Sequence, residues 1–237
     1  MKYSGKLTLV FLLALYIGPI LFISSYGHTA ILAEPNTIKD FAPASEWYNE
    51  SWEYRCGISI TGSVGAGTDY QILITVPYAA HMQTDFDDLL FTDDNGITEL
   101  DYWIESYVAS TSAVVWVEVA DDLDSNQVIY MYSGNDEVST TSDGDTTFLL
   151  FDDFNDDSKN TTKWDSSVGT TEAGGYLSVP ISGQWFGSVA HFQSGTAIEA
   201  RTKQVGQQKH NMGYGNTWPV TNPQWINHAF GGDTFMY

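Results

Sequence analysis

The sequence predicts an all-β fold, with two jelly-roll-like β-sandwich units after an N-terminal signal segment. Short runs of alternating apolar residues recur along the chain, Asp, Asn and Gly residues separate them, and almost no stretch has a helical period. We expect a signal or anchor at 1–33, a proline-containing linker at 34–47, a first unit at 48–150 and a second unit at 151–237.

The N-terminal segment has the pattern of an export signal. Lys2 and Lys6 precede a 17-residue apolar run from Leu7 to Ile23, and small residues follow it up to Ala33. Because no position is a clean small-x-small cleavage site, an uncleaved membrane anchor remains the alternative. The signal predicts an extracellular or cell-surface protein that meets a membrane only through this segment.

The strands of the first unit follow from apolar alternation and turn residues. Ile72, Ile74 and Val76 share one face of an expected strand. Asn95-Gly96 is a strong hairpin signal between two further runs. The expected strands are 54–61, 70–76, 89–92, 97–107, 113–119 and 127–132, and we expect the last two to form a second hairpin across the acidic turn 121–126.

Several blocks in this unit occur in a characteristic order. They are Trp-Glu-Tyr-Arg at 52–55, Phe-Thr-Asp-Asp-Asn-Gly at 91–96, Tyr-Trp-Ile-Glu-Ser-Tyr at 102–107, Ala-Val-Val-Trp-Val-Glu-Val at 113–119, Ile-Tyr-Met-Tyr-Ser-Gly-Asn at 129–135 and Phe-Leu-Leu-Phe-Asp-Asp-Phe at 148–154. Together they resemble an extracellular family known as domain of unknown function 2341, over about residues 48–150. This resemblance implies a family and a β-rich fold but no chemistry.

The second unit opens on Asp-Asp-Phe at 152–154, followed by Lys163-Trp164. With expected strands at 176–179 and 196–203, it resembles the beginning of a concanavalin A-like lectin/glucanase jelly roll. Such a fold needs two packed sheets of several strands each. Since residues 151–237 supply about half of that, we expect the sequence to be a fragment of a longer protein.

The charge excludes one class of partner. The chain carries 30 Asp/Glu against 9 Lys/Arg, a formal net charge of −21. Most of the imbalance lies at 34–150, where 22 acids face only Lys39 and Arg55. Because this field repels phosphate backbones, nucleic acid is not an expected partner. Cys56 is the single cysteine, so no intrachain disulfide can form.

A cluster of carboxylates is the candidate metal site. Asp152, Asp153 and Asp156 lie close together in sequence with Asp157, and Ca²⁺ prefers several hard oxygen ligands. The jelly-roll resemblance also implies a structural calcium ion near the first strand. The alternative is an Asx-rich turn that binds no metal. We expect no other cofactor.

Aromatic side chains are the candidate ligand-binding residues, because sugar rings stack on flat aromatic faces. Trp185 and Phe186 lie in the glycine-flanked segment 183–187, and Trp164 and Tyr176 belong to the same unit. We assign no catalytic residue. The Glu-x-Asp-x-x-Glu strand of laminarinase-type enzymes and the Gly-x-Ser-x-Gly elbow are both missing from the sequence.

The sequence therefore predicts an exported protein that binds a carbohydrate or cell-envelope polymer without cleaving it. Two alternatives remain open. One is a polysaccharide hydrolase whose acid pair follows Tyr237, and the other is a structural spacer in a cell-envelope or transport-associated assembly.

Overall fold

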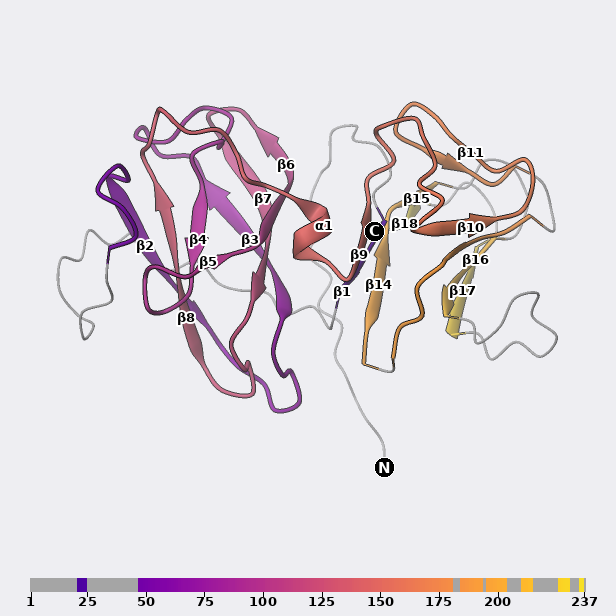
Figure 1. Ribbon diagram of the computed structural model, residues 1–237, viewed down its shortest axis with the longest axis horizontal. Helices are drawn as coiled ribbons and strands as arrows, with labels where there is room; N and C mark the ends of the chain where they lie inside the picture. Colours follow the sequence, from indigo (N-terminus) through magenta and orange to yellow (C-terminus); the bar gives the residue numbers. More distant parts are fainter. Residues whose placement is uncertain are drawn as a thin grey trace.

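The chain is an all-β protein. The computed structural model describes residues 21–24, 47–180, 184–193, 195–203, 210–214, 226–230 and 235–236. Figure 1 shows strands β2 to β8 on one side, β1 with β9 and the later strands on the other, and the helix α1 (Gly144–Thr147) between them. Over the described ranges, no helix is both long and apolar enough to cross a membrane.

Two sheets form a sandwich-like unit between residues 54 and 133. One is four-stranded in the order β2-β8-β4-β5 and the other three-stranded in the order β3-β7-β6, with every neighbouring pair antiparallel. Their strands are β2 (Tyr54–Ile60), β3 (Tyr70–Pro77), β4 (Leu90–Thr92), β5 (Glu99–Leu100), β6 (Tyr102–Val108), β7 (Ser112–Val119) and β8 (Gln127–Ser133).

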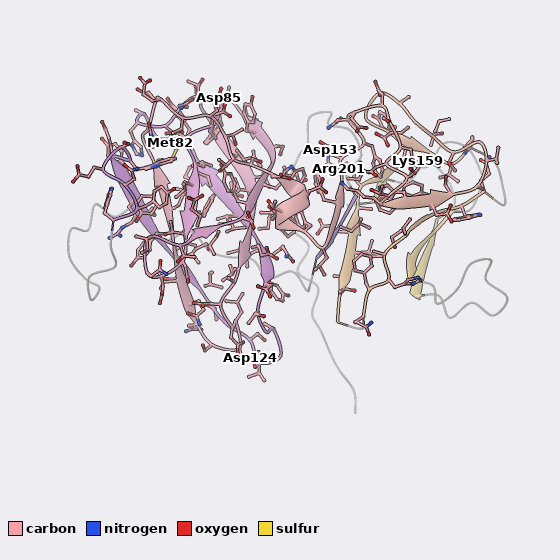
Figure 2. The ribbon with its side chains drawn as sticks, in the orientation of Figure 1. Met82, Asp85, Asp124, Asp153, Lys159 and Arg201 are labelled. Carbon is pink, nitrogen blue, oxygen red and sulfur yellow. The ribbon has the colours of Figure 1, made fainter. Side chains whose placement is uncertain are left out.

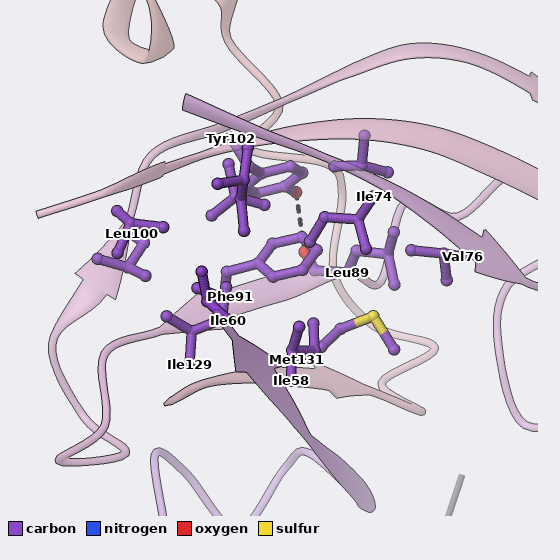
Figure 3. Close-up of a cluster of buried hydrophobic side chains, with 14 of the residues drawn as sticks. Ile58, Ile60, Ile74, Val76, Leu89, Phe91, Leu100, Tyr102, Ile129 and Met131 are labelled. Atoms are coloured by element: carbon purple, nitrogen blue, oxygen red, sulfur yellow. Dashed lines mark hydrogen bonds between the residues drawn. The ribbon is translucent and has the colours of Figure 1, made fainter. Parts of the chain in front are cut away.

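Alternation along each strand builds the core between the two sheets. Ile72, Ile74 and Val76 of β3 point inward as predicted, and all three are fully buried. Ile58 of β2 and Met131 of β8 face them from the other sheet (Figure 3). The hydroxyl of buried Tyr102 donates to the carbonyl of Leu89 at 2.8 Å, so the polar end of this core ring is satisfied.

Of the two predicted hairpins, the first is confirmed and the second is wrong. β4 and β5 pair across Asn95-Gly96, where Gly96 has a φ of 81°. The second predicted hairpin is wrong, because β7 pairs with β3 and β6 whereas β8 pairs with β2 and β4. The loop between β7 and β8 crosses from one sheet to the other, and Leu123 anchors it inside the core at 2% exposure.

A predicted strand is also divided. The run 97–107 contains β5 and β6, which belong to different sheets and are separated by Asp101. Alternating apolar residues give the same pattern on both sides of such a crossing, so the pattern alone did not locate it.

The segment after β8 covers the outer face of the three-stranded sheet. Phe148 and Phe151 pack on Trp103 of β6 and Trp116 of β7, with ring centroids 4.6–5.9 Å apart. Asp143 caps α1 by accepting a hydrogen bond from the amide of Asp145 at 2.8 Å. An ion pair of 3.2 Å between Arg201 and Glu105 adds a second contact between the two regions.

The region after α1 consists of short strands in small sheets. A three-stranded sheet has the order β14-β1-β9, and β1 lies inside the segment 1–33 that we predicted to be an export signal. The remaining strands pair two by two. The bounds are β1 (Leu21–Ser24), β9 (Leu150–Asp152), β10 (Trp164–Ser166), β11 (Thr171–Glu172), β12 (Leu177–Ser178), β13 (Phe186–Ser188), β14 (Ala197–Ala200), β15 (Thr202–Lys203), β16 (His210–Tyr214), β17 (Ile226–Phe230) and β18 (Phe235–Met236).

Candidate functional site

A groove of about 920 Å³ lies on the first unit, between the segment that precedes β2 and the loops that follow β3 and β8. Met82, labelled in Figure 2, belongs to the loop after β3 and marks one wall. Aromatic, amide and carboxylate side chains dominate the lining. The lining residues are Tyr48, Asn49, Ser51, Trp52, Glu53, Ala80, His81, Met82, Leu89, Leu90, Glu99, Gly134, Asn135, Asp136, Glu137, Val138, Ser139 and Thr141.

The segment before β2 is held against the sheet by its aromatic residues. Trp52 is buried with Leu90 and Tyr132, and the ring of Tyr48 lies 6.0 Å from that of Tyr132. The indole of Trp47 donates to the carbonyl of Trp52 at 3.1 Å, and the amide of Tyr48 donates to the Tyr132 hydroxyl at 3.2 Å. These contacts fix one wall of the groove although the segment contains no strand of its own.

A buried carboxylate fixes the opposite wall. Asp88 is fully buried, and its two oxygens accept hydrogen bonds from the amides of Gln83 at 2.9 Å and Gly134 at 2.6 Å. The side-chain amide of Gln83 donates to the carbonyls of Asn135 and Val138 at 2.9 and 3.0 Å. The loop after β8 is therefore tied to the loop after β3.

The backbone conformation of the same wall requires glycine at position 134. Gly134 has a φ of 82°, and a β-carbon at this position would lie 2.7 Å from the ring of Tyr54. Tyr54 in turn stacks on His81 at a centroid distance of 3.6 Å. A larger residue at position 134 would therefore displace the Tyr54 ring that stacks on His81.

The groove carries negative charge at neutral pH. Glu53, Glu99, Asp136 and Glu137 line it, and its lining contains neither lysine nor arginine. Partial burial lowers the pKa of His81 below its ordinary value of 6.5, and the charges of Asp88 and Glu53 oppose this shift. The imidazole is therefore mainly neutral at pH 7 and adds little positive charge.

A tyrosine phenol is held in its neutral form at the rim. The hydroxyl of Tyr48 donates to Glu99, and this bond, together with burial and the Glu99 charge, raises the pKa of Tyr48 to about 12. The Tyr48 ring is therefore an uncharged stacking surface next to a carboxylate acceptor.

Arg55 lies beside this site on the surface of aromatic rings. Its guanidinium carbon is 5.0, 4.4 and 5.8 Å from the ring centroids of Trp47, Tyr130 and Tyr132. It supports the rings behind the groove and is not among the lining residues.

The structure brings two of the four residues predicted to bind a ligand, Trp164 and Phe186, together in a small core. Trp164 is 3% exposed and stacks on Phe186 at 4.5 Å, inside a small core with Phe154. A sugar cannot reach a ring face that Phe186 already covers, so Trp164 is a core residue. Trp185 and Tyr176 are half-buried. Their role in ligand binding stays a prediction.

The predicted metal ligands make local hydrogen bonds. Asp152 accepts from the amide of Phe154 at 2.9 Å and from the indole of Trp164 at 2.6 Å, so both of its oxygens are occupied. Asp153, labelled in Figure 2, accepts from the amide and side chain of Asn155. Asp156 accepts from the amide of Ser158 at 2.9 Å. This is the geometry of Asx turns, the alternative that the sequence left open.

Sequence reasoning missed the groove. Its walls come from three segments far apart in the chain, and the segment at 47–52 was divided between the predicted linker and the beginning of the first unit. The available signal was the density of aromatic residues beside acids there, but nothing local indicates that residues 80–82 and 134–141 meet it.

Comparisons with known proteins add one finding. Searches of curated proteins and of solved structures found no match. Residues 85–167, from the loop after β3 through β10, match the model of the family described as Domain of unknown function (DUF2341). The match begins later than residue 48 and continues past residue 150, so it includes α1, β9 and the Trp164 strand. The chain is thus similar over this segment to DUF2341, a family defined by its sequence and not by an activity.

Proposed function

We propose that this protein is an exported surface protein that binds a carbohydrate or cell-envelope polymer without cleaving it, and that the groove of the first unit holds the ligand. The observation that carries the proposal is the joint presence, in one groove of about 920 Å³, of aromatic rings and carboxylates. Recognition sites for small molecules and short polymer segments reach about this size.

The groove chemistry matches a sugar chain. The rings of Tyr48 and His81 line the groove, and Tyr54 covers one face of the His81 ring. The Tyr48 ring and the other face of His81 suit stacking on the C–H side of a pyranose. The carboxylates of Glu53, Glu99 and Asp136 accept hydrogen bonds from hydroxyl groups, and the amide of Asn135 both donates and accepts.

The charge of the groove narrows the ligand class. Four carboxylates without a lysine or arginine among the lining residues repel uronic acids and phosphate-containing polymers. A neutral or amine-bearing glycan is therefore favoured over a polyanionic one.

The same proposal includes a jelly-roll arrangement for residues 151–237 and a signal function for residues 1–33. The Asp-Asp-Phe turn beside Trp164 and the antiparallel pairing of short strands support the first. The Lys2-Lys6 start and the following apolar run support the second.

A binding panel tests the ligand class. The purified chain is titrated with a neutral β-glucan, an amine-bearing chitosan oligosaccharide and an anionic alginate. We expect binding to one of the first two and none to alginate. A preference for alginate, or release of reducing sugar, contradicts the proposal, and no binding to any glycan favours the structural spacer.

Variants locate the site. Tyr48→Ala and His81→Ala each remove a stacking surface, so each is expected to weaken binding about fivefold or more, on the order of 1 kcal/mol. Tyr107→Ala is the matched control, because Tyr107 is an exposed aromatic residue of β6 outside the groove. Equal loss of binding in all three variants argues against the groove.

A further inference from the structure

One carboxylate in the second region is buried with little polar support. Glu172 of β11 is 8% exposed, and both of its carboxylate oxygens are shielded from solvent and lack a donor at ordinary hydrogen-bond geometry among the described residues. The polar groups that act on this carboxyl include the Asp156 side chain and the backbone of Ser158. An ionised carboxylate in such a place carries a large desolvation cost unless a proton or a cation neutralises it.

The fold brings a second carboxylate to this point. The β11–β12 hairpin turns at Gly174-Gly175, and the amide of Gly174 donates to the carboxylate of Asp157. This bond ties the hairpin to the loop after β9, which is also where Asp156 lies. The carboxylates of Asp156 and Glu172 consequently lie beside each other, Asp156 at the exposed edge and Glu172 inside.

The nearby positive charges bond elsewhere. Lys163 forms an ion pair with Asp145 and donates to the carbonyl of Phe151 at 2.9 Å. Lys159, labelled in Figure 2, donates to the hydroxyl of Ser166. Burial, followed by the side-chain hydrogen bond with Asp156 and by the charges of Asp152 and Asp156, raises the pKa of Glu172 to about 7. The ionised form of Glu172 is therefore disfavoured unless a cation compensates its charge.

We propose that Glu172 and Asp156 bind a divalent cation with the preferences of Ca²⁺. Glu172 supplies two solvent-shielded oxygens from the inside, and Asp156 supplies a carboxylate at the solvent edge through which the ion enters. Ca²⁺ accepts carboxylates in either mode and completes its shell with carbonyls and water, whereas Mg²⁺ requires a more regular octahedron.

This assignment differs from the sequence prediction in two of three ligands. It keeps Asp156 but replaces Asp152 and Asp153, whose oxygens accept hydrogen bonds from neighbouring groups, with Glu172. A second acidic group, Asp93, Asp94 and Asp121, brings three carboxylates within 4.8 Å of one another. None of these three carboxylates is buried, so none carries the desolvation cost that a cation would relieve at Glu172. We use this group as the control.

Catalysis is a poorer interpretation of the Asp156–Glu172 pair. Two carboxyl groups with opposite pKa shifts are typical of a glycosidase. The oxygens of Glu172 are shielded from solvent, however, so they cannot reach a glycosidic oxygen. A metal ion is small enough to reach these oxygens, whereas a sugar is too large.

Thermal melts and calorimetric titrations of the full chain test the proposal. CaCl₂ is compared with MgCl₂ and with NaCl at matched ionic strength. For the wild type we expect Ca²⁺ to raise the melting temperature of the second region by several degrees, with a stoichiometry of one, and Mg²⁺ to have a smaller effect.

Isosteric variants identify the ligands. Glu172→Gln is expected to raise the melting temperature in chelator, because it removes the buried charge, and to abolish the calcium shift. Asp156→Asn, at an exposed position that tolerates substitution, is expected to weaken the calcium Kd about tenfold or more. Asp94→Asn is the control and should retain the full shift.

Two outcomes overturn the assignment. One is a wild-type chain that shows no calcium effect beyond that of ionic strength. The other is a calcium shift that survives in both Glu172→Gln and Asp156→Asn, or that disappears in Asp94→Asn. The test is independent of glycan binding in the first unit.

Discussion

The two regions of the molecule use the same aromatic residue types in opposite ways. In the first unit Tyr48 lines an open groove, supported from behind by Trp52 and Tyr132. In the second region Trp164 and Phe186 stack on each other at 4.5 Å and close a small core. The comparison teaches that an aromatic ring near a turn becomes a binding surface only if no other ring covers its face.

The largest expected effect tests the closed cluster. Trp164→Ala removes a buried indole and its hydrogen bond to Asp152, and we expect a loss of about 3–5 kcal/mol in the stability of the second region. Hydrogen exchange should show faster opening at 150–190 while 54–133 stays protected. Trp185→Ala, at a half-buried position, is the control and should cost less. Equal costs would mean that the two rings are equally important to the core.

The next effect concerns the wall of the open groove. Asp88→Ala leaves the half-buried amides of Gln83 and Gly134 without their charged acceptor, which should cost about 1–3 kcal/mol. Because these bonds hold the loop after β8, glycan binding should fall together with stability. Urea unfolding and titration measure the two effects. Asp136→Asn, an exposed change in the same loop, should leave stability within about 0.5 kcal/mol.

A pH effect is expected on the outer face of the three-stranded sheet. Burial, followed by the charges of Asp69 and Asp101, raises the pKa of Glu118 to about 7 from its ordinary value of 4.5. The folded state thus holds a proton that the unfolded state releases. The contribution of Glu118 to stability is therefore greatest below pH 4.5 and falls as the pH rises to about 7.

Glu118→Gln should remove that decline. Relative to the wild type, the variant is expected to gain about 1–2 kcal/mol at pH 8 and little at pH 4. Chemical unfolding at the two pH values measures the difference, and Gln71, which donates to Glu118 at 2.9 Å, stays in place. A gain of the same size at both pH values would contradict titration of Glu118.

The smallest expected effect decides between the regions as binding sites. If the groove binds the glycan, Tyr48→Ala weakens binding about fivefold and Trp185→Ala leaves it unchanged. If the loop of Trp185 binds the glycan, Trp185→Ala weakens binding about fivefold and Tyr48→Ala leaves it unchanged, again a difference of about 1 kcal/mol in binding free energy. Loss in both variants would mean that the ligand spans the two regions.

Several local features of the fold were predictable from sequence. The alternation of Ile72, Ile74 and Val76 identified the inner face of β3, because side chains in a strand point to opposite faces in turn. Asn95-Gly96 identified the β4–β5 hairpin, because Gly96 tolerates a positive φ. The acidic run at 152–157 forms the local side-chain-to-backbone hydrogen bonds that an Asx-rich turn predicts, and metal binding by Asp152, Asp153 and Asp156 stays a prediction.

Pairings between sheets were not predictable in the same way. Strands β7 and β8 follow each other with a short acidic loop, yet they lie in different sheets because Leu123 anchors that loop in the core. Periodicity reports which face of a strand is apolar. It does not report whether the next strand lies beside it or across the core from it.

The sequence alone determined the all-β class, the inner faces of the main strands, the acidic charge and the similarity to DUF2341. All of these depend on residues close together in the chain. Only the tertiary structure decided that Trp164 is covered by Phe186, that three distant segments enclose a groove, and that Glu172 is buried beside Asp156. Each of these depends on which surfaces meet after the sheets have packed, and burial, not residue type, determines whether a ring or a carboxylate remains available to a ligand.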